Sequence, residues 1–120
     1  MSSSPDAFHL PRLTLSVAPE RLAIARLDPD APFPVWVMHA EARLWSVTRT
    51  PEEMSVVCDD GAVPPSVERV ERPFRALRVH GPLDFNLAGV IAGLTATLAV
   101  AGIPVFVIAT FDTDWLLVRE

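Results

Sequence analysis

Apolar residues alternate with polar ones over much of the first half of the chain, and this period of two is typical of strands with one buried face. The pattern predicts strands at residues 13–17, 22–27, 44–48 and 54–58. A turn at 19–20 separates the first two strands, so we expect these two to pair as a hairpin. Val35, Met38 and Ala42 follow helical spacing instead and predict a short helix over 33–42.

The second half contains a long stretch without charge, from Phe85 to Phe111. Its length would suit a membrane span, but Gly102 and Pro104 inside it are a helix stop, and the residues after them are β-branched and aromatic. We therefore expect a buried helix that ends at Gly102 and a strand over 104–111, with no membrane span. The remaining strands of this half are predicted at 75–80 and 115–118.

Two segments of the sequence resemble each other and indicate an internal repeat. Leu44–Val57 aligns without a gap on Val105–Val118, so that Glu53 falls on Asp114. Each half then contains a strand, a helix, a strand, a tight turn and a strand, which predicts an α+β fold with helices on one face of an antiparallel sheet. The predicted organisation is a disordered tail at 1–11, a first half at 12–62, a linker at 63–73 and a second half at 74–120.

The composition fits a folded protein and excludes several functional classes. Half of the residues are hydrophobic, which excludes intrinsic disorder for most of the chain. A net charge of -5 and a pI of about 5.1 give no broad basic surface, so we expect no nucleic-acid partner and no attraction to anionic membranes. The first residues have no signal-peptide pattern, and the single cysteine, Cys58, excludes an internal disulfide. We therefore expect a cytoplasmic protein.

The sequence contains no catalytic or metal-binding motif. His9, His39 and His80 are isolated in the sequence, and no phosphate-binding glycine loop or nucleophile motif occurs. We expect no metal and no cofactor. Two segments are better candidates for a ligand site, because each places polar side chains in a turn beside a predicted sheet. They are 81–86, which precedes the long helix, and 110–114, which joins the last two strands.

These two segments resemble the small ACT-domain proteins related to the CASTOR arginine sensors. The resemblance is carried by the Gly-Pro-Leu-Asp-Phe sequence at 81–85, by Gly89-Val90, and by the run 101–118 with its Thr-Phe-Asp-Thr-Asp segment. Segments 44–58 and 72–79 also fit the family.

The resemblance implies a ferredoxin-like ACT fold with two ACT-like halves, no catalytic activity, and a free amino acid as the ligand. It also implies that Asp114 matches the acid that faces a cationic side chain in the arginine sensors. Carried over by position, the residues implied to line the ligand site are Asp84, Phe85, Gly89, Val90, Thr110, Phe111, Asp112, Thr113 and Asp114.

Family members usually continue past the strand that ends here at Val118 into a final helix and strand. The resemblance therefore implies an unpaired sheet edge, and a second copy of the chain would cover it, so we expect a homodimer. The expected function is an amino-acid-binding regulatory or sensor domain. The alternative is a structural homodimerisation module without a ligand. A third interpretation is a small enzyme that uses an acid/base pair such as Asp84 with Asp112 or His80.

Overall fold

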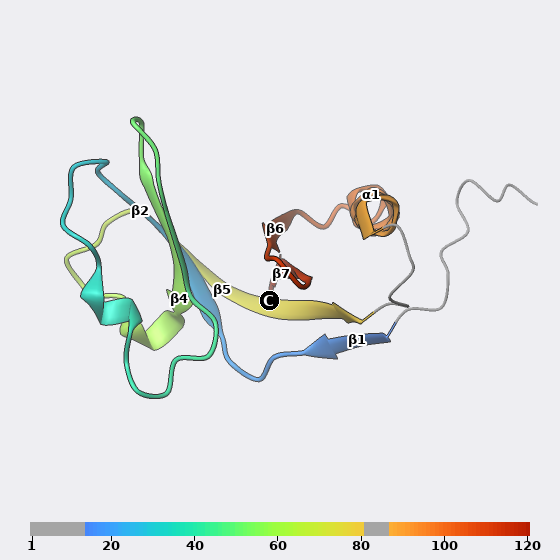
Figure 1. Ribbon diagram of the computed structural model, residues 1–120, viewed down its shortest axis with the longest axis horizontal. Coiled ribbons are helices and arrows are strands. Elements are labelled where there is room, and N and C mark those ends of the chain that lie inside the picture. Colours follow the sequence, from blue (N-terminus) through green and yellow to red (C-terminus); the bar gives the residue numbers. More distant parts are fainter. Residues whose placement is uncertain (1–13, 81–86) are drawn as a thin grey trace, which may run out of the picture. The chain divides into compact units, whose positions relative to one another are not determined.

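The computed structural model describes residues 14–80 and 87–120, and these form two compact units (Figure 1). The N-terminal unit consists of Pro19–Arg75 with Glu120. Of the described residues, the C-terminal unit contains those from 14 to 18, from 76 to 80 and from 87 to 119. The tail predicted at 1–11 and the segment 81–86 lie outside the described residues.

The N-terminal unit is an antiparallel sheet in the order β3-β4-β2-β5. Its strand β4 lies between β3 and β2, and four of its six residues are buried, among them Val56, Val57 and Cys58. Met54 and Val37 complete the same core. The elements of this unit are β2 (Leu22–Leu27), the 3-10 turn η2 (Val35–Val37), β3 (Ser46–Arg49), β4 (Met54–Asp59), the 3-10 turn η3 (Asp60–Ala62) and the first part of β5 (Val70–His80).

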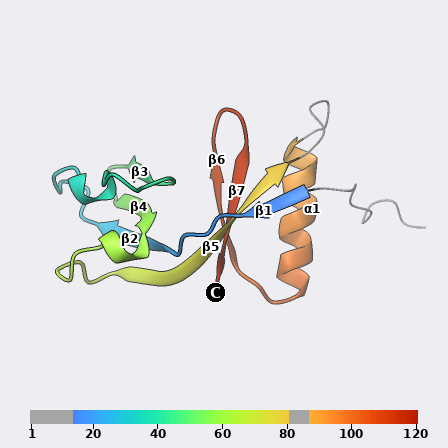
Figure 2. The same ribbon diagram turned by 90° about the horizontal axis from the view of Figure 1, so that it is seen from below.

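The C-terminal unit places the second part of β5 between β1 and β7, with β6 beyond β7. The remaining elements are β1 (Thr14–Val17), α1 (Leu87–Val100), β6 (Val105–Ala109) and β7 (Asp114–Arg119), and Figure 2 shows the β6–β7 hairpin and α1. Val79 and Leu116 form the buried core of the sheet face that packs against Ile91 and Leu94 of α1.

The helix α1 ends at Val100 and is terminated by Gly102, as the sequence predicts, but its described residues are exposed or partly buried rather than buried. Gly102 has a φ of 76°, and its N–H donates to the carbonyl of Ala99 over 3.0 Å. The N–H of Ile103 donates to the carbonyl of Leu98 over 2.8 Å, which completes a Schellman motif. In the described part of the chain no helix is long and apolar enough to cross a bilayer, since α1 has only 14 residues.

The prediction of helices on one face of the sheet is not confirmed. The described residues contain one α-helix, α1, and the helix predicted over 33–42 is a single 3-10 turn at Val35–Val37. The β-branched Val35 and Val37 lower the helix propensity of this segment. The fold is therefore mostly antiparallel sheet with one helix.

Two predictions about strands are wrong. The first two strands do not pair as a hairpin: β1 pairs with the end of β5, where Thr14 faces His80, and β2 pairs with β4 and with the start of β5. The strand predicted at 75–80 begins at Val70, so part of the predicted linker 63–73 is sheet. Both errors come from β5, whose charged and proline-containing first residues do not show an apolar pattern.

The predicted repeat is confirmed in the order of its strands, but not in its register or in the helix of the first half, where the structure has only the 3-10 turn η2. The strand orders β2-β4-β3 and β5-β7-β6 correspond, because in each the second strand of a hairpin, β4 or β7, lies next to an earlier strand, β2 or β5. The hairpin pairs Arg49 with Met54 in one unit and Ala109 with Asp114 in the other. Asp114 therefore corresponds to Met54, and the alignment of Glu53 with Asp114 is wrong by one residue. Such a slip exchanges the two faces of a strand.

Candidate functional site

The first wall of the predicted ligand site is only partly described. Asp84 and Phe85 lie outside the described residues. Gly89 is exposed near the start of α1, and Val90 follows it in the helix. The predicted meeting of this wall with residues 110–114 therefore stays a prediction.

The second wall is the turn between β6 and β7, and hydrogen bonds within the turn hold it together. The N–H and the hydroxyl of Thr110 both donate to the carbonyl of Thr113 over 2.8 Å. The Thr110 hydroxyl accepts from the N–H of Thr113 over 3.2 Å, and the Thr113 hydroxyl donates to the carbonyl of Val79 over 3.2 Å. The hydroxyl protons of both threonines are therefore used to fix the turn.

The other three predicted residues of this turn present groups that a ligand can reach. Phe111 is 101% exposed at the tip of the turn, and Asp112 beside it is exposed. Asp114 begins β7 and is partly buried. It lies two residues before the buried Leu116, so both side chains belong to the sheet face that packs against α1. A carboxylate at this position is available to a ligand's ammonium or guanidinium group.

The turn between β3 and β4 has the same hydrogen bonds. The threonine at the start of each turn therefore stabilises the hairpin. The N–H of Thr50 donates to the carbonyl of Glu53 over 2.8 Å, and the Thr50 hydroxyl accepts from the N–H of Glu53 over 3.1 Å. Because Thr50 and Thr110 make the same bonds in the two turns, we assign their hydroxyls a role in turn stability and not in ligand binding. The difference between the two turns is the residue that follows, which is the buried Met54 in one and Asp114 in the other.

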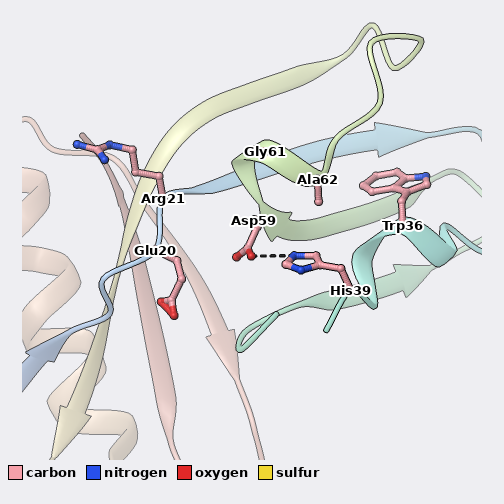
Figure 3. A pocket seen from close by; sticks show the side chains of 7 residues that line it. All are labelled: Glu20, Arg21, Trp36, His39, Asp59, Gly61 and Ala62. Carbon is pink, nitrogen blue, oxygen red and sulfur yellow. Dashed lines mark ion pairs between the residues drawn. The ribbon is translucent and has the colours of Figure 1, made fainter. Parts of the chain in front are cut away.

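A pocket of about 500 Å³ lies in the N-terminal unit, and the sequence did not point to it (Figure 3). At its centre Nε2 of His39 lies 2.8 Å from Oδ2 of Asp59, whose side chain is 19% exposed. His39 follows η2 and Asp59 ends β4, so the two are far apart in the sequence, and isolated residues carry no spacing signal. The pocket is lined by Glu20, Arg21, Trp36, His39, Asp59, Gly61 and Ala62.

Ion pairs occupy several of the charged groups around this pocket. Arg21 donates two hydrogen bonds to the carboxylate of Glu120, over 2.7 and 3.0 Å. Glu20 lies 3.8 Å from Nε of Arg43, a longer contact to a side chain that is 77% exposed. His39 and Asp59 form the remaining pair. Among the described residues no group of three or more His, Cys, Asp or Glu side chains is placed to hold a metal ion.

The thiol of Cys58 lies behind this pocket in the core and is not a candidate nucleophile. Burial raises the pKa of Cys58 to about 11, and the negative charges of Asp59 and Asp60 add to the effect, while Arg72 opposes it. A thiol with this pKa stays protonated near neutrality, and the thiolate is the reactive form.

Comparisons with known families divide the chain between residues 66 and 69, a few residues before the boundary at Arg75 that separates the two structural units. A family model of the ACT domain matches residues 69–120, and a model of an N-terminal domain matches residues 20–66. The first range contains all nine residues of the predicted ligand site. A comparison with curated proteins found no match.

Two of the solved structures similar to this chain are bacterial proteins. The crystal structure of protein Atu0741 from Agobacterium tumefaciens is 35% identical, with a TM-score of 0.81, and the match covers 91% of this chain and 79% of that one. VC0802 from Vibrio cholerae, a protein of unknown function described as a possible transport protein, shares the fold at 16% identity and a TM-score of 0.70, covering 90% and 79% of the two chains. This chain therefore belongs to the family of Atu0741, and its residues 69–120 form an ACT domain.

Proposed function

We propose that this protein is a non-catalytic regulatory or sensor domain that binds a free amino acid. The observation that carries the proposal is the ACT match over residues 69–120, because ACT domains are typically small-ligand regulatory domains and this range holds every residue of the predicted site. The proposed ligand-contacting side chains are those that the structure leaves available in the turn, Phe111, Asp112 and Asp114.

The geometry of the turn supports a role for Asp114 in choosing the ligand. In the N-terminal unit the corresponding position is Met54, which is 1% exposed and packs in the core. Burying a carboxylate at such a position costs folding free energy, unless a cation or a hydrogen-bond donor pairs with it. Asp114 is in this place, so we propose that it receives the cationic group of a basic amino acid, as the resemblance to the arginine sensors implies.

The proposal extends to the organisation of the chain. Both units share the strand order described above, which supports two ACT-like halves even though the N-terminal residues 20–66 match a different family model. The exposed apolar side chains of the C-terminal unit, among them Phe106 and Val107 on β6, support a homodimer. β6 is the outer strand of its hairpin, and an outer strand offers backbone groups for pairing.

A thermal-shift screen with the twenty amino acids tests the proposal. A ligand at 100 times its Kd stabilises the folded state by about 2.7 kcal/mol, so binding gives a clear rise in Tm. Asp114→Asn should remove the response to a basic amino acid. Asp30→Asn, in an exposed loop of the N-terminal unit, is the matched control and should keep the response. A flat screen, or an unchanged response in Asp114→Asn, contradicts the proposal.

The second candidate function is a homodimerisation module without a ligand, and the same exposed apolar residues favour it. Phe106 and Val107 are each 38% exposed on one strand. This candidate predicts a dimer in sedimentation at low micromolar concentration together with a flat amino-acid screen. An amino-acid response from a monomer would exclude it.

A further inference from the structure

The strand β6 has a free edge, and the register of its hairpin identifies the backbone groups on that edge. Among the described residues β6 has a neighbouring strand, β7, on one side only. Thr110 donates its N–H to the carbonyl of Thr113, and residues along an antiparallel pair alternate between hydrogen-bonded and non-bonded positions. In this register the N–H and C=O groups of Val105, Val107 and Ala109 therefore point away from β7.

The free edge of β6 is complementary to the same edge of a second copy. A two-fold axis brings identical edges together, and the edges of two such copies can then pair as antiparallel strands. The register that pairs all three outward-pointing residues is centred on Val107, which then lies opposite Val107 of the partner subunit. Val105 then lies opposite the partner subunit's Ala109. The side chain of Val107 is 38% exposed on the sheet face of Leu116, so this pairing would also give it an apolar neighbour.

The C-terminal unit also has an apolar groove between α1 and the start of β6. Its volume is about 650 Å³, and its walls include Ala92, Ala96, Ala99, Ile103, Pro104 and Val105. No charged side chain among the described residues lines it. The hydroxyl of Thr95, which also lines the groove, donates to the carbonyl of Ile91 over 2.9 Å. The groove therefore suits an apolar occupant.

The side chain that fits this groove is Phe111, which is 101% exposed at the tip of the β6–β7 hairpin. Figure 2 shows the tip and the connection from α1 to β6 at opposite ends of the hairpin. In the register centred on Val107, antiparallel pairing brings each tip to that connection in the other copy. Phe111 then lies beside the partner subunit's Ile103, at the groove. The stretch 85–111 contains both parts of this contact and has no charge, which favours a second copy over a charged partner.

We propose that two copies of this chain pair through β6, and that Phe111 of each copy packs in the groove of the other. The contact gives partners to the outward backbone groups of β6 and removes Phe111 and Val107 from water. This inference rests on the homodimer of the proposed function, and it adds the register of the pairing and a role for Phe111 that needs no ligand.

Charge substitutions at the proposed axis test the register. In sedimentation, Val107→Lys and Val107→Glu should each be monomeric where the wild type is a dimer, since each places like charges directly opposite one another. An equimolar mixture of the two should form dimers again, because a lysine then faces a glutamate. Val35→Lys and Val35→Glu are the matched controls in the N-terminal unit, where Val35 is 66% exposed, and both should stay dimeric. A monomeric wild type, or a mixture that stays monomeric, overturns the proposal.

Two further variants test the groove. Phe111→Ser should weaken the dimer at least about tenfold, because a large apolar side chain no longer leaves water on association. Ala96→Trp should weaken it similarly by filling the groove without a change of charge. Val35→Ser is the control and should leave the dimer affinity unchanged. Unchanged affinity in both groove variants overturns the role of Phe111.

The failure of this contact and of the proposed function can be told apart. A dimer that persists in Val107→Lys and Val107→Glu leaves the proposed homodimer intact and shows that the β6 contact is wrong. If these variants dissociate and their mixture forms dimers while the wild type responds to no amino acid, the contact is right and the amino-acid proposal is wrong.

Discussion

Raising the pH above 9 should weaken the N-terminal unit through one side chain, the thiol of Cys58 in β4. The thiol is 0% exposed and lies in the core beside Met54 and Val56. Burial raises its pKa from 9.0 to about 11, chiefly because a thiolate in the core loses its hydration, and Asp59 next to it adds a repulsive charge. The folded chain therefore holds this proton at a pH where the unfolded chain has already released it.

The size of the effect follows from the two pKa values. Because the folded-state pKa is the higher one, the stabilisation is complete below pH 9.0 and is lost as the pH rises towards about 11. One pKa unit corresponds to about 1.36 kcal/mol, so the free energy of unfolding should fall by roughly 2.7 kcal/mol across this window. This is a large part of the stability of a typical small domain, about 5–15 kcal/mol.

The composition of the chain makes this window free of other titrating side chains. The sequence contains no tyrosine, and all 10 of its basic residues are arginine, whose pKa lies above about 12. The pH dependence of stability between 9 and 11 should therefore report on Cys58.

Urea unfolding, followed by tryptophan fluorescence at several pH values from 8 to 11, measures the effect. Cys58→Ala is the control: it is less stable at every pH because it leaves a cavity, but its stability should change little across the window. The comparison is between the slopes of unfolding free energy against pH, and the constant cost of the cavity does not change these slopes. If the wild-type and Cys58→Ala curves fall in parallel, the reasoning about the buried thiol is refuted.

Two further predictions concern the turns. Gly102→Ala should destabilise the chain by about 1 kcal/mol in urea unfolding, because a φ of 76° is strained for alanine, whereas Gly61→Ala should have almost no effect. An equal loss in both variants would contradict the argument from backbone strain. Thr110→Val and Thr50→Val should each cost roughly 1–2 kcal/mol, since each removes the hydroxyl that closes a hairpin turn. A clear loss of stability in only one of them would mean that the two turns are not equivalent.

The parts of the fold that local chemistry determines were predictable from the sequence. The strand at 22–27 was predicted with the bounds that the structure has, and the stop at Gly102 needed only a glycine followed by a proline. The polar segment 110–114 predicts a connection between two apolar strands, and the structure has this turn at 110–113, although the strand predicted over 104–111 ends at Ala109. Each of these features is determined by neighbours in the sequence.

The parts that depend on distant contacts were not predictable. The first residues of β5 contain Glu71, Arg72 and Pro73 and resemble a linker, and they form a strand because β2 pairs with them. The predicted register of the repeat is wrong because three consecutive residues of β4 are buried. An alignment that matches only apolar residues then fits equally well when it is shifted by one residue. The fold brings His39 and Asp59 together, and because they are 20 positions apart their spacing in the sequence matches no motif.

The division of β5 between the two units has a consequence for the order in which the chain folds. The C-terminal unit is discontinuous: Thr14–Val17 must pair with residues 77–80, and the whole of Pro19–Arg75 lies between them in the sequence. The hairpin contacts of β3 with β4 are local, and closing a long loop in an unfolded chain costs conformational entropy before any contact is gained. Once Pro19–Arg75 is folded, the two ends of this segment are fixed, so β1 and residues 77–80 of β5 pair at a smaller cost in conformational entropy. We therefore expect the N-terminal unit to form first and the pairing of β1 with β5 to complete the C-terminal unit afterwards.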